Sequence, residues 1–475
     1  MAVESPDVLA RMPLAEAVLT LWCWVADEPY LNQVFEENRG RCYEKILSFP
    51  LMVRLIRDAL LEHEGSGRKS FEHALEREEL ATSLNAAYGK LGRLPISVSM
   101  AFLSSCTARL REVYPQTEMA QVPIPESLAG FRPIIFDGKA IKNVAKRLKP
   151  LRGVAGGMLG GRTLVAMDLL TGLALTMHAH PDGDANDTRF VGDLVPKVRD
   201  LAAGPLLFLV DSGFCDLTQT AHFTANPGDE FVVRYHPKVR FECDPERPAH
   251  EGRDQRGRLY CEDWGWLGSP QNKKRRYVRR ITLKRPGEKD VILITSLCDA
   301  EAYPAVDVLE LYLMRWGIER MFQQVTEVFG LSGLIGTTPE GTIFQFAMCL
   351  LLYNMIQVVR GVIATEVEKP REEISTENLF DDVHRELIAW SVVITPEVTL
   401  KHFEGEWTAL RVKARLSELL GNLWHNRWRK APPKKKKPPH PKKGKGEHGS
   451  VFRILEAHTQ RIRDQQAAAK QAQRC

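Results

Sequence analysis

The sequence predicts an α/β fold in which a mixed sheet with a β-rich insertion follows a helical N-terminal region. Apolar residues recur at helical spacing up to about residue 115, β-type runs begin after Pro125, and further short strands fill residues 239–300. The 475 residues exceed what one compact core usually requires. We therefore expect five segments: a helical region over 1–120, the first part of the core over 121–238, the insertion over 239–300, the second part of the core with C-terminal helices over 301–425, and a basic tail over 426–475.

Two stretches of the N-terminal region carry apolar residues three and four positions apart, as helices do. They contain Leu14, Val18, Leu19 and Trp22, and then Leu51, Leu55, Leu60 and Leu61. The Gly-Ser-Gly sequence at 65–67 marks a break between helices. The region is either a helical DNA-binding module or a helical cap, and its sequence does not separate the two.

Short apolar runs after Pro125 predict the strands of the sheet. They cover residues 132–137, 162–168, 173–178, 206–210 and 231–235. Thr171 and Gly172 separate the second run from the third, which predicts a hairpin. Residues 196–203 are expected to form the end of a helix. Hairpin strands followed by strands that alternate with helices are typical of a mixed α/β sheet.

Residues 239–300 are too long a stretch to be a structureless connection inside a compact domain. Three strands are predicted there, over 258–266, 276–284 and 291–297. On the middle strand, period two places Arg276, Arg280 and Lys284 on one face with Val278 and Thr282, and Tyr277, Ile281 and Leu283 on the other. One face of the insertion would then be basic, while the other would pack.

Basic charge is concentrated in two runs without acids. Residues 273–285 hold eight Lys or Arg, and residues 427–445 hold ten, although the whole chain carries only +5. Such concentration indicates a polyanionic partner, and the alternative is a solvated strand and a solubilising tail. The Lys- and Pro-rich tail is expected to be disordered when free, with a short amphipathic segment over 451–463 after it.

The cysteines argue against a disulfide-bonded or zinc-binding protein, and the apolar stretches argue against a secreted or membrane-spanning one. Nine scattered cysteines without a CxxC pair indicate free thiols in a reducing cytoplasm, and Cys243, Cys261, His236 and His250 do not match zinc spacing. The N-terminus lacks the pattern of a signal peptide. The most apolar stretch, 343–363, is interrupted by polar residues, which favours a buried core helix over a membrane span. These are Gln345, Asn354, Gln357 and Arg360.

Three carboxylates are candidates for metal-dependent chemistry. Asp137 and Asp211 each end an apolar run, and a predicted helix over 308–329 carries Tyr312, Arg315 and Glu319 on one face. Clustered carboxylates can hold two Mg²⁺ ions, which activate an oxygen nucleophile and stabilise a leaving oxygen in phosphodiester chemistry. The arginine can fork onto a phosphate, and the tyrosine can donate to one or stack. Alternatively, each aspartate is a turn or helix cap, and the Arg-Glu pair lies on a solvated face.

Taken in order, these segments resemble the DDE transposases of bacterial insertion sequences. The motifs are Phe136-Asp137-Gly138, Asp211-Ser212-Gly213-Phe214, and a helix with Tyr312, Arg315 and Glu319 in which Trp316 and Phe322 hold their usual places. The closest group is the one called insertion sequence four, and the resemblance spans about residues 130–366. It implies an RNase H-like catalytic fold, and the 107 residues between Asp211 and Glu319 agree with the β-rich insertion of that family.

The resemblance also implies an activity. Asp137, Asp211 and Glu319 would bind two Mg²⁺ ions, which Mn²⁺ can replace, cleave double-stranded DNA at the inverted-repeat ends of a transposon, and join the freed ends to target DNA. Tyr312 and Arg315 would hold the phosphate beside the break. The protein would act as a homodimer at the bacterial nucleoid in the cytoplasm, without a membrane.

The insertion supplies further candidates for contact with DNA. Trp264 or Trp266 would stack on an extruded base, as an aromatic residue of the family's insertion does, unless both are core residues. Arg276, Arg280 and Lys284, together with the tail, would add affinity for the DNA backbone that falls with salt.

One position departs from the family, because Thr326 stands where the signature has a lysine that contacts the phosphate backbone. Either a nearby base such as Arg320 compensates, or the activity is weakened. Two other functions stay open: an RNase H-like nuclease that cuts without joining, and a non-catalytic DNA-binding protein derived from a transposase.

Overall fold

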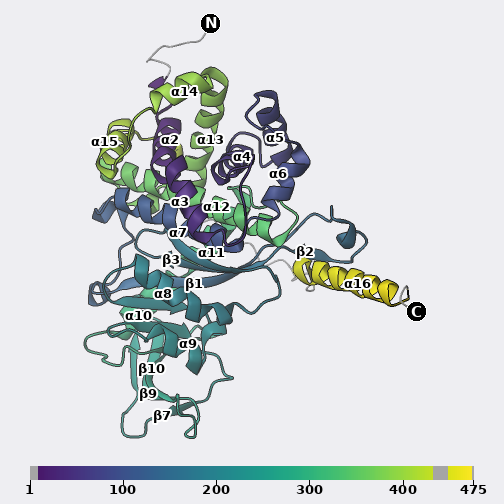
Figure 1. Ribbon diagram of the computed structural model, residues 1–475. Coiled ribbons are helices and arrows are strands. Elements are labelled where there is room, and N and C mark those ends of the chain that lie inside the picture. Colours follow the sequence, from purple (N-terminus) through teal and green to yellow (C-terminus); the bar gives the residue numbers. More distant parts are fainter. Residues whose placement is uncertain (1–8, 432–447, 473–475) are drawn as a thin grey trace.

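The N-terminal region is helical, as predicted, in the computed structural model, which describes residues 9–431 and 448–472. Its helices are α2 (Pro13–Val25), α3 (Glu28–Asn38), α4 (Phe49–Leu61), α5 (Gly67–Glu76), α6 (Leu84–Leu91) and α7 (Ile96–Val113). The side chain of Ser66 caps α5 by accepting from the backbone N–H of Lys69, so the predicted break at 65–67 falls at a helix start. These helices pack with the C-terminal helices above the sheet (Figure 1) and cover one side of the core.

A mixed sheet of ten strands runs through the molecule (Figure 1). The strands are β1 (Arg132–Ala140), β3 (Arg162–Asp168), β4 (Ala174–His180), β5 (Leu206–Val210), β6 (Glu230–Arg234), β7 (Phe241–Cys243), β8 (His250–Arg253), β9 (Leu259–Leu267), β10 (Arg276–Leu283) and β11 (Val291–Thr295). Their order is β4-β3-β1-β5-β6-β11-β10-β9-β7, and β8 pairs with β9. The predicted α/β class with a mixed sheet is therefore confirmed.

The centre of the sheet is parallel, because β1 pairs with β5 and β5 pairs with β6 in the same direction. Helices α8 (Val191–Leu201) and α9 (Leu217–Phe223) precede and follow β5 in the chain. On the other side of β1, β3 and β4 form the predicted hairpin. Its turn contains Gly172, whose φ of +68° is a left-handed conformation that glycine adopts without steric cost.

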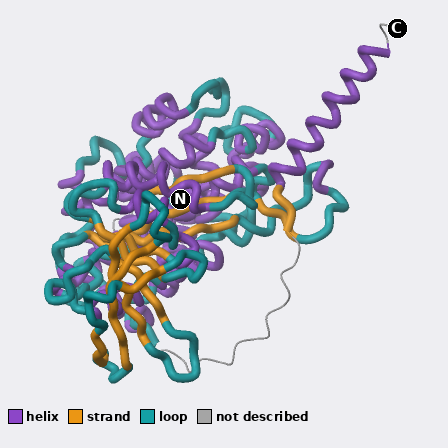
Figure 2. Tube along the Cα trace, turned by 90° about the horizontal axis from the view of Figure 1, so that it is seen from below, coloured by secondary structure: helices purple, strands orange, loops and turns teal. Residues whose placement is uncertain are grey.

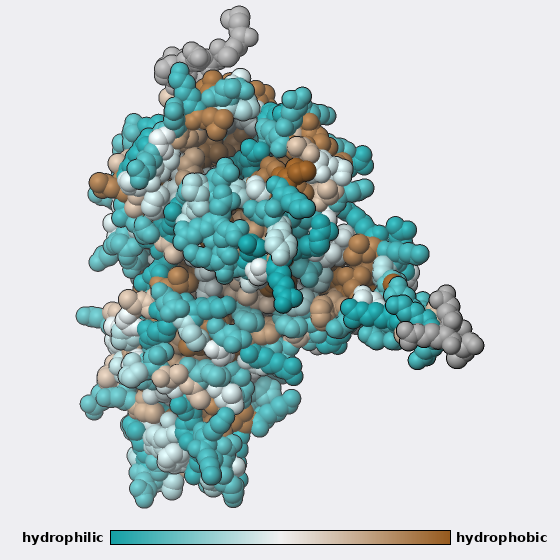
Figure 3. Space-filling view, viewed as in Figure 1, coloured by the Kyte–Doolittle hydropathy of each residue, from teal (hydrophilic) through white to brown (hydrophobic). Residues whose placement is uncertain are grey.

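The strands of residues 239–300 continue this same sheet. β11 pairs with β6, for example at Leu293 and Arg234, and β10, β9 and β7 follow outward. The strands β9, β10 and β11 lie close to the three predicted runs, whereas the sequence does not predict β7 and β8. The hydrogen bonding of β11 to β6, which joins these strands to the core sheet, leaves no local signal in the sequence. The outer end formed by β7, β9 and β10 presents mainly hydrophilic side chains in the view of Figure 3.

The helix predicted over 308–329 is in fact two helices, α10 (Ala305–Leu313) and α11 (Trp316–Glu327). At Met314 and Arg315 the backbone N–H groups bond three residues back, to Leu311 and Tyr312, so the path tightens before α11 begins. Both residues keep right-handed helical dihedral angles. The side-chain periodicity therefore continues across the break and conceals it.

The central helix of the upper layer is α12 (Pro339–Glu366), which is followed by α13 (Thr376–Val393), α14 (Pro396–His402) and α15 (Ala409–Leu420). Among the described helices, α12 is long and apolar enough to cross a membrane, but its apolar window lies entirely inside the fold. Its polar residues have partners there. Asn354 accepts from the backbone N–H of Ala174 and donates to the carbonyl of the same residue, both at 2.9 Å. The predicted core helix is confirmed, and this bond ties it to β4.

The C-terminal segment first pairs with a strand of the main body, and its last helix then extends away from that body. β12 (His448–Ser450) pairs with β2 (Gly157–Leu159), and α16 (Val451–Ala472) extends away from the body of the molecule, as Figure 2 shows. This helix is longer than the amphipathic segment predicted over 451–463. Residues 432–447, which include most of the Lys- and Pro-rich tail, lie outside the described residues. All eight cysteines within the described part are free thiols, as expected.

Candidate active site

The pairing of β1 with β5 brings Asp137 and Asp211 together. Phe136 pairs with Val210 in a parallel register, so the residues that follow each of them lie side by side. The sequence predicts that Asp137 ends its strand, but β1 continues to Ala140, so Asp137 lies within the strand. Asp211 does end its strand, directly before a short 3₁₀ helix over Ser212–Phe214.

Strand alternation turns Asp137 toward α11, the helix that carries Glu319. Phe136 packs edge-on against Phe208 and Phe223, the second of which belongs to α9. Neighbouring residues on a strand point to opposite faces. Asp137 therefore points away from α9, to the side on which α11 packs against β1.

The surroundings of the two aspartates favour binding of a cation. Burial raises the pKa of Asp137 to about 6; Arg315 opposes this shift, while Glu319 and Asp211 add to it. The Oδ1 atom of Asp211 is buried and has no hydrogen-bond partner among the described residues. A buried acceptor without a donor is costly, and a metal ion is one way to satisfy it.

Arg315 is enclosed between the carboxylates. Its side chain is only 4% exposed, and its guanidinium donates to Glu319 Oε1 at 3.1 Å. Burial alone would lower the pKa of Arg315, but Tyr312, Asp211, Asp137 and Glu319 together raise it above its usual value. The guanidinium thus balances the negative charge of the cluster.

The predicted three-carboxylate metal centre is not assembled in this arrangement. Within residues 9–431 and 448–472, no group of three or more His, Cys, Asp or Glu side chains could hold a metal ion. Glu319 pairs with Arg315 and does not close on the aspartates. The donor set still fits a hard divalent cation, because it consists of carboxylates and includes the unpartnered Asp211 Oδ1. The Glu319 side chain is 39% exposed, which leaves it room to turn from Arg315 to a metal.

The sequence predicts that Tyr312 contacts a phosphate, but in the structure its side chain is buried. The residue is 4% exposed, and its hydroxyl donates to the carbonyl of Val210 at 3.2 Å. Burial raises the pKa of Tyr312 to about 12, so the hydroxyl stays protonated and keeps donating. The bond anchors α10 to the last residue of β5, beside Asp211.

Tyr312→Phe therefore has a structural effect in the first place. We expect it to lower the free energy of unfolding by about 1 kcal/mol, because the Val210 carbonyl loses a hydrogen bond. DNA cleavage, the activity that the resemblance in the sequence implies, should fall by less than about tenfold, because such a fall corresponds to at most about 1.4 kcal/mol. Thermal unfolding and a cleavage assay measure the two effects, and a loss of cleavage near a thousandfold with unchanged stability would assign Tyr312 to the phosphate instead.

Lys139 on β1 brings a positive charge to Thr326. Its Nζ lies 3.1 Å from Thr326 Oγ1 and 5.5 Å from the ring centre of Phe322, so a positive charge lies beside Thr326 on α11. Arg320, which the sequence suggests as the substitute, lines a different cavity. The sequence does hold a signal for Lys139: it is two residues after Asp137 on one strand, and so on the same face.

Gly138 has no room for a side chain. A Cβ atom there would lie 1.7 Å from Asp187 Oδ2, and Asp187 is held by Arg162 at 2.5 Å. At Gly213, in the second motif, nothing lies within 4 Å of such an atom. Glycine is thus required by packing in the first motif only.

Gly138→Ala should consequently destabilise the protein by about 1–3 kcal/mol, because Asp187 must move from Arg162. Gly213→Ala is the matched control, with an expected change within about 0.5 kcal/mol. Thermal unfolding of the two variants compares them directly. Equal midpoints would show that the Asp187 side chain yields without cost.

The basic face predicted on β10 is not free. Arg280 pairs with Asp263 at 2.5 Å, directly across the strands, and Lys284 pairs with Asp290 at 2.9 Å. Arg276 donates to Thr224 Oγ1 at 2.7 Å. The run without acids along the chain conceals these partners, because they lie on neighbouring segments of the folded sheet.

The two tryptophans of the insertion differ in exposure. Trp264 is 1% exposed and donates to the carbonyl of Cys298 at 2.9 Å, so its predicted role in base stacking is wrong and it is a core residue. Trp266 is 38% exposed. Arg275 lies over its ring and Tyr277 meets its edge, so Trp266 stays a candidate for contact with DNA.

A comparison with protein families identifies the region that holds this cluster. Residues 134–355 match the family model described as Transposase DDE domain, a range that begins in β1, ends in α12 and includes Asp137, Asp211 and Glu319. No curated protein matches the chain. The sheet with its parallel centre, the helices around it and this match agree, and residues 134–355 form a transposase DDE domain of the RNase H-like type.

Proposed function

We propose that this protein is a transposase of the insertion-sequence-four group, which cleaves DNA at transposon ends and joins them to target DNA. The observation that carries the proposal is the position of Asp137 and Asp211 on neighbouring parallel strands, with Glu319 and Arg315 beside them on one helix and its start. This arrangement lies inside a transposase DDE domain. The domain implies DNA as the partner, and the protein acts as a dimer that pairs two ends.

Asp137, Asp211 and Glu319 are the ligands for divalent metal in this proposal. Two bound Mg²⁺ ions would supply the positive charge that activates the attacking oxygen and stabilises the leaving oxygen. The protein's part is to hold the carboxylates: β1 and β5 fix the aspartates, and the bond from Tyr312 to Val210 fixes the end of β5. Glu319 joins them by leaving Arg315.

Arg315 then has a second task. Once Glu319 turns away, its guanidinium is free to donate to a phosphate oxygen of DNA, for which its planar fork is suited. Because the side chain is almost enclosed, little conformational entropy is lost when it binds. Arg315 thus exchanges a carboxylate of the protein for a phosphate of the substrate.

Lys139 supplies the charge that Thr326 lacks. Its ammonium lies on the same face of β1 as Asp137, next to α11, and can reach a phosphate beside the cluster. Thr326 accepts a hydrogen bond from it and so directs it. We propose this role in place of the two alternatives for the missing lysine, which are compensation by Arg320 and a weakened activity.

A joining assay separates the proposal from its rivals. Short inverted repeats are sought in the DNA that flanks the gene, and this DNA is incubated with the full chain, Mg²⁺ and a circular target plasmid. A transposase gives 3′-OH ends and joined products that depend on Mg²⁺. Cleavage without joining would favour the nuclease, and binding without cleavage would favour the non-catalytic DNA-binding protein.

A further inference from the structure

A cavity lies on the side of α11 that faces away from Glu319. It has a volume of about 340 Å³ and is lined on α11 by Gly317, Arg320, Met321 and Gln324. Spacings of three and four place these residues on one stripe, and Glu319 falls on the opposite side of the helix. The cavity is therefore separate from the carboxylate cluster.

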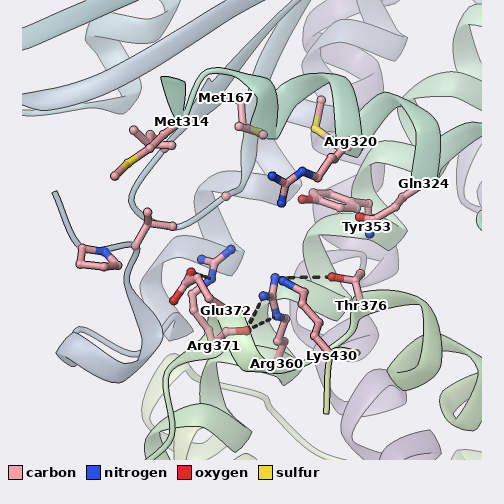
Figure 4. A pocket seen from close by; sticks show the side chains of 16 residues that line it. Met167, Met314, Arg320, Gln324, Tyr353, Arg360, Arg371, Glu372, Thr376 and Lys430 are labelled. Atoms are coloured by element: carbon pink, nitrogen blue, oxygen red, sulfur yellow. Dashed lines mark hydrogen bonds and ion pairs between the residues drawn. The ribbon is translucent and has the colours of Figure 1, made fainter. Parts of the chain in front are cut away.

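The polar side of this cavity is strongly cationic. Arg320, Arg360, Arg371 and Lys430 line it, with Glu372 as the acid among the lining residues (Figure 4). They come from α11, from α12, from the segment between α12 and α13, and from the end of the first described range. Segments distant in the chain thus bring four positive charges to one place, against one negative charge.

The two inner arginines are held by neutral groups. Arg360 and Arg371 are 6% and 4% exposed. Arg360 donates to the carbonyl of Arg371 at 2.9 Å, and Arg371 donates to the hydroxyl of Tyr114 at 2.8 Å. Within the described ranges, the ion pair formed by these cations is that of Arg371 with Glu372, at 3.5 Å. The Nε atom of Arg371 is the atom that faces Glu372 in this pair, and it makes no hydrogen bond in the part of the chain that the structure describes.

The crowding of cations affects the titration of the cluster. Burial, followed by the charges of its neighbours, lowers the pKa of Lys430 to about 8 and that of Arg360 to about 10. The positive charges of Arg320, Arg360, Arg371 and Lys430 repel one another in a partly buried site. An anion in the cavity would remove this repulsion and would meet donors already in place.

The remaining wall of the cavity is apolar and aromatic. It includes Met167, Met314, Met321 and the ring of Tyr353. Figure 4 shows Met167 and Met314 on the side of the cavity away from Arg360 and Lys430. A volume of about 340 Å³ falls in the range of sites for small molecules. A ligand that fits both walls has an anionic head and a compact, largely apolar body.

We propose that this cavity binds a small phosphate-bearing ligand of the size of a nucleoside monophosphate. Its phosphate lies among Arg320, Arg360 and Lys430, and its ring lies against the methionines and Tyr353. Arginine forks suit phosphate oxygens, and thioether and aromatic side chains suit a planar ring. This inference does not rest on the proposed function, because the cavity is separate from the carboxylate cluster and ligand binding can be measured without DNA.

Calorimetric titration of the full chain with adenosine 5′-monophosphate tests the proposal, with adenosine and inorganic phosphate as the partial probes and sodium chloride at matched ionic strength. We expect the monophosphate to bind at least about tenfold more tightly than either part alone, since the two walls act on one molecule. Lys430→Gln and Arg320→Gln, whose side chains reach the cavity from the exposed surface, should each weaken binding about tenfold. Lys413→Gln, which removes an exposed charge on α15 outside the cavity, should leave it unchanged.

Thermal unfolding with and without the monophosphate guards against misfolded variants. Each ligand-free variant should unfold near the wild-type temperature, and the ligand should stabilise Lys430→Gln and Arg320→Gln less than it stabilises the wild type and Lys413→Gln. No binding by the wild type would overturn the proposal. So would equal binding by Lys430→Gln, or equal affinity for adenosine and its monophosphate.

Discussion

Asp137→Asn is expected to lower DNA strand cleavage by roughly a thousandfold or more while end binding stays within about threefold of the wild type. The substitution keeps the size of the side chain and removes the negative charge that a metal ligand needs. Asp137 lies inside β1, and the amide can still accept the bond from the Gly138 N–H, which is 2.9 Å in the wild type. The fold should therefore persist, and gel-based cleavage and binding assays on the same DNA report the two effects separately.

Glu310→Gln serves as the matched control for this loss. Glu310 is an exposed carboxylate on α10, outside the cluster, and its replacement should leave cleavage unchanged. If Asp137→Asn cleaves DNA as well as Glu310→Gln does, the assignment of Asp137 to the metal is wrong. A parallel loss of binding in Asp137→Asn would instead indicate a damaged fold.

The second large effect concerns the charge beside Thr326. Lys139→Thr should lower cleavage by about 10- to 100-fold, or about 1.4–2.7 kcal/mol of transition-state stabilisation, because a phosphate beside the cluster loses its cation. The double variant Lys139→Thr/Thr326→Lys should regain most of the activity, since the two side chains are 3.1 Å apart and the charge returns to nearly the same place. Thr326→Lys alone should bring no gain, because two cations would then compete for one position.

Lys142→Thr is the control for this exchange. Lys142 is exposed and three residues from Lys139, so its loss removes the same charge from the same region without touching Thr326. Cleavage by this variant should stay within about twofold of the wild type, as for an exposed charge without partners. If Lys139→Thr has no larger effect than Lys142→Thr, Lys139 does not replace the signature lysine. A gain from Thr326→Lys in the wild-type background would lead to the same conclusion.

Much of the fold can be predicted from the sequence, because buried strands and helices leave local patterns. The runs 162–168 and 206–210 coincide with β3 and β5. A strand buried on both faces is continuously apolar, as all of β5 and residues 164–167 of β3 are. The break between α10 and α11 cannot be predicted from the sequence, because it leaves no local pattern. A tightened turn at Met314 and Arg315 preserves right-handed dihedral angles, so the spacing of the side chains barely changes.

The candidate site is predictable in its residues but not in its contacts. The motifs identify Asp137, Asp211 and Glu319, yet spacing alone does not reveal that Glu319 pairs with Arg315. The contact of Tyr312 with Val210 joins residues that are 102 positions apart, and that of Lys139 with Thr326 joins residues 187 apart. Such contacts depend on the register of β1 with β5 and on the packing of α11. No local pattern in the sequence encodes them.

The insertion illustrates the same limit for charge. A run of basic residues without acids on β10 predicts a free basic face, but Arg280 faces Asp263 across β9. Pairing between strands is decided by register, which composition does not specify. The cationic cavity behind α11 escapes notice for a related reason, because Arg320, Arg360 and Lys430 are spread over more than a hundred residues.

Binding of Mn²⁺, followed through the loss of its free paramagnetic resonance signal, tests most directly whether the three carboxylates form one metal site. We expect the wild type and Glu310→Gln to bind Mn²⁺ equally, and Asp137→Asn, Asp211→Asn and Glu319→Gln each to bind at least about tenfold more weakly. Glu319 is the decisive residue, because its carboxylate must leave Arg315 to join the aspartates. Binding of Mn²⁺ by Glu319→Gln with wild-type affinity would contradict the three-carboxylate centre.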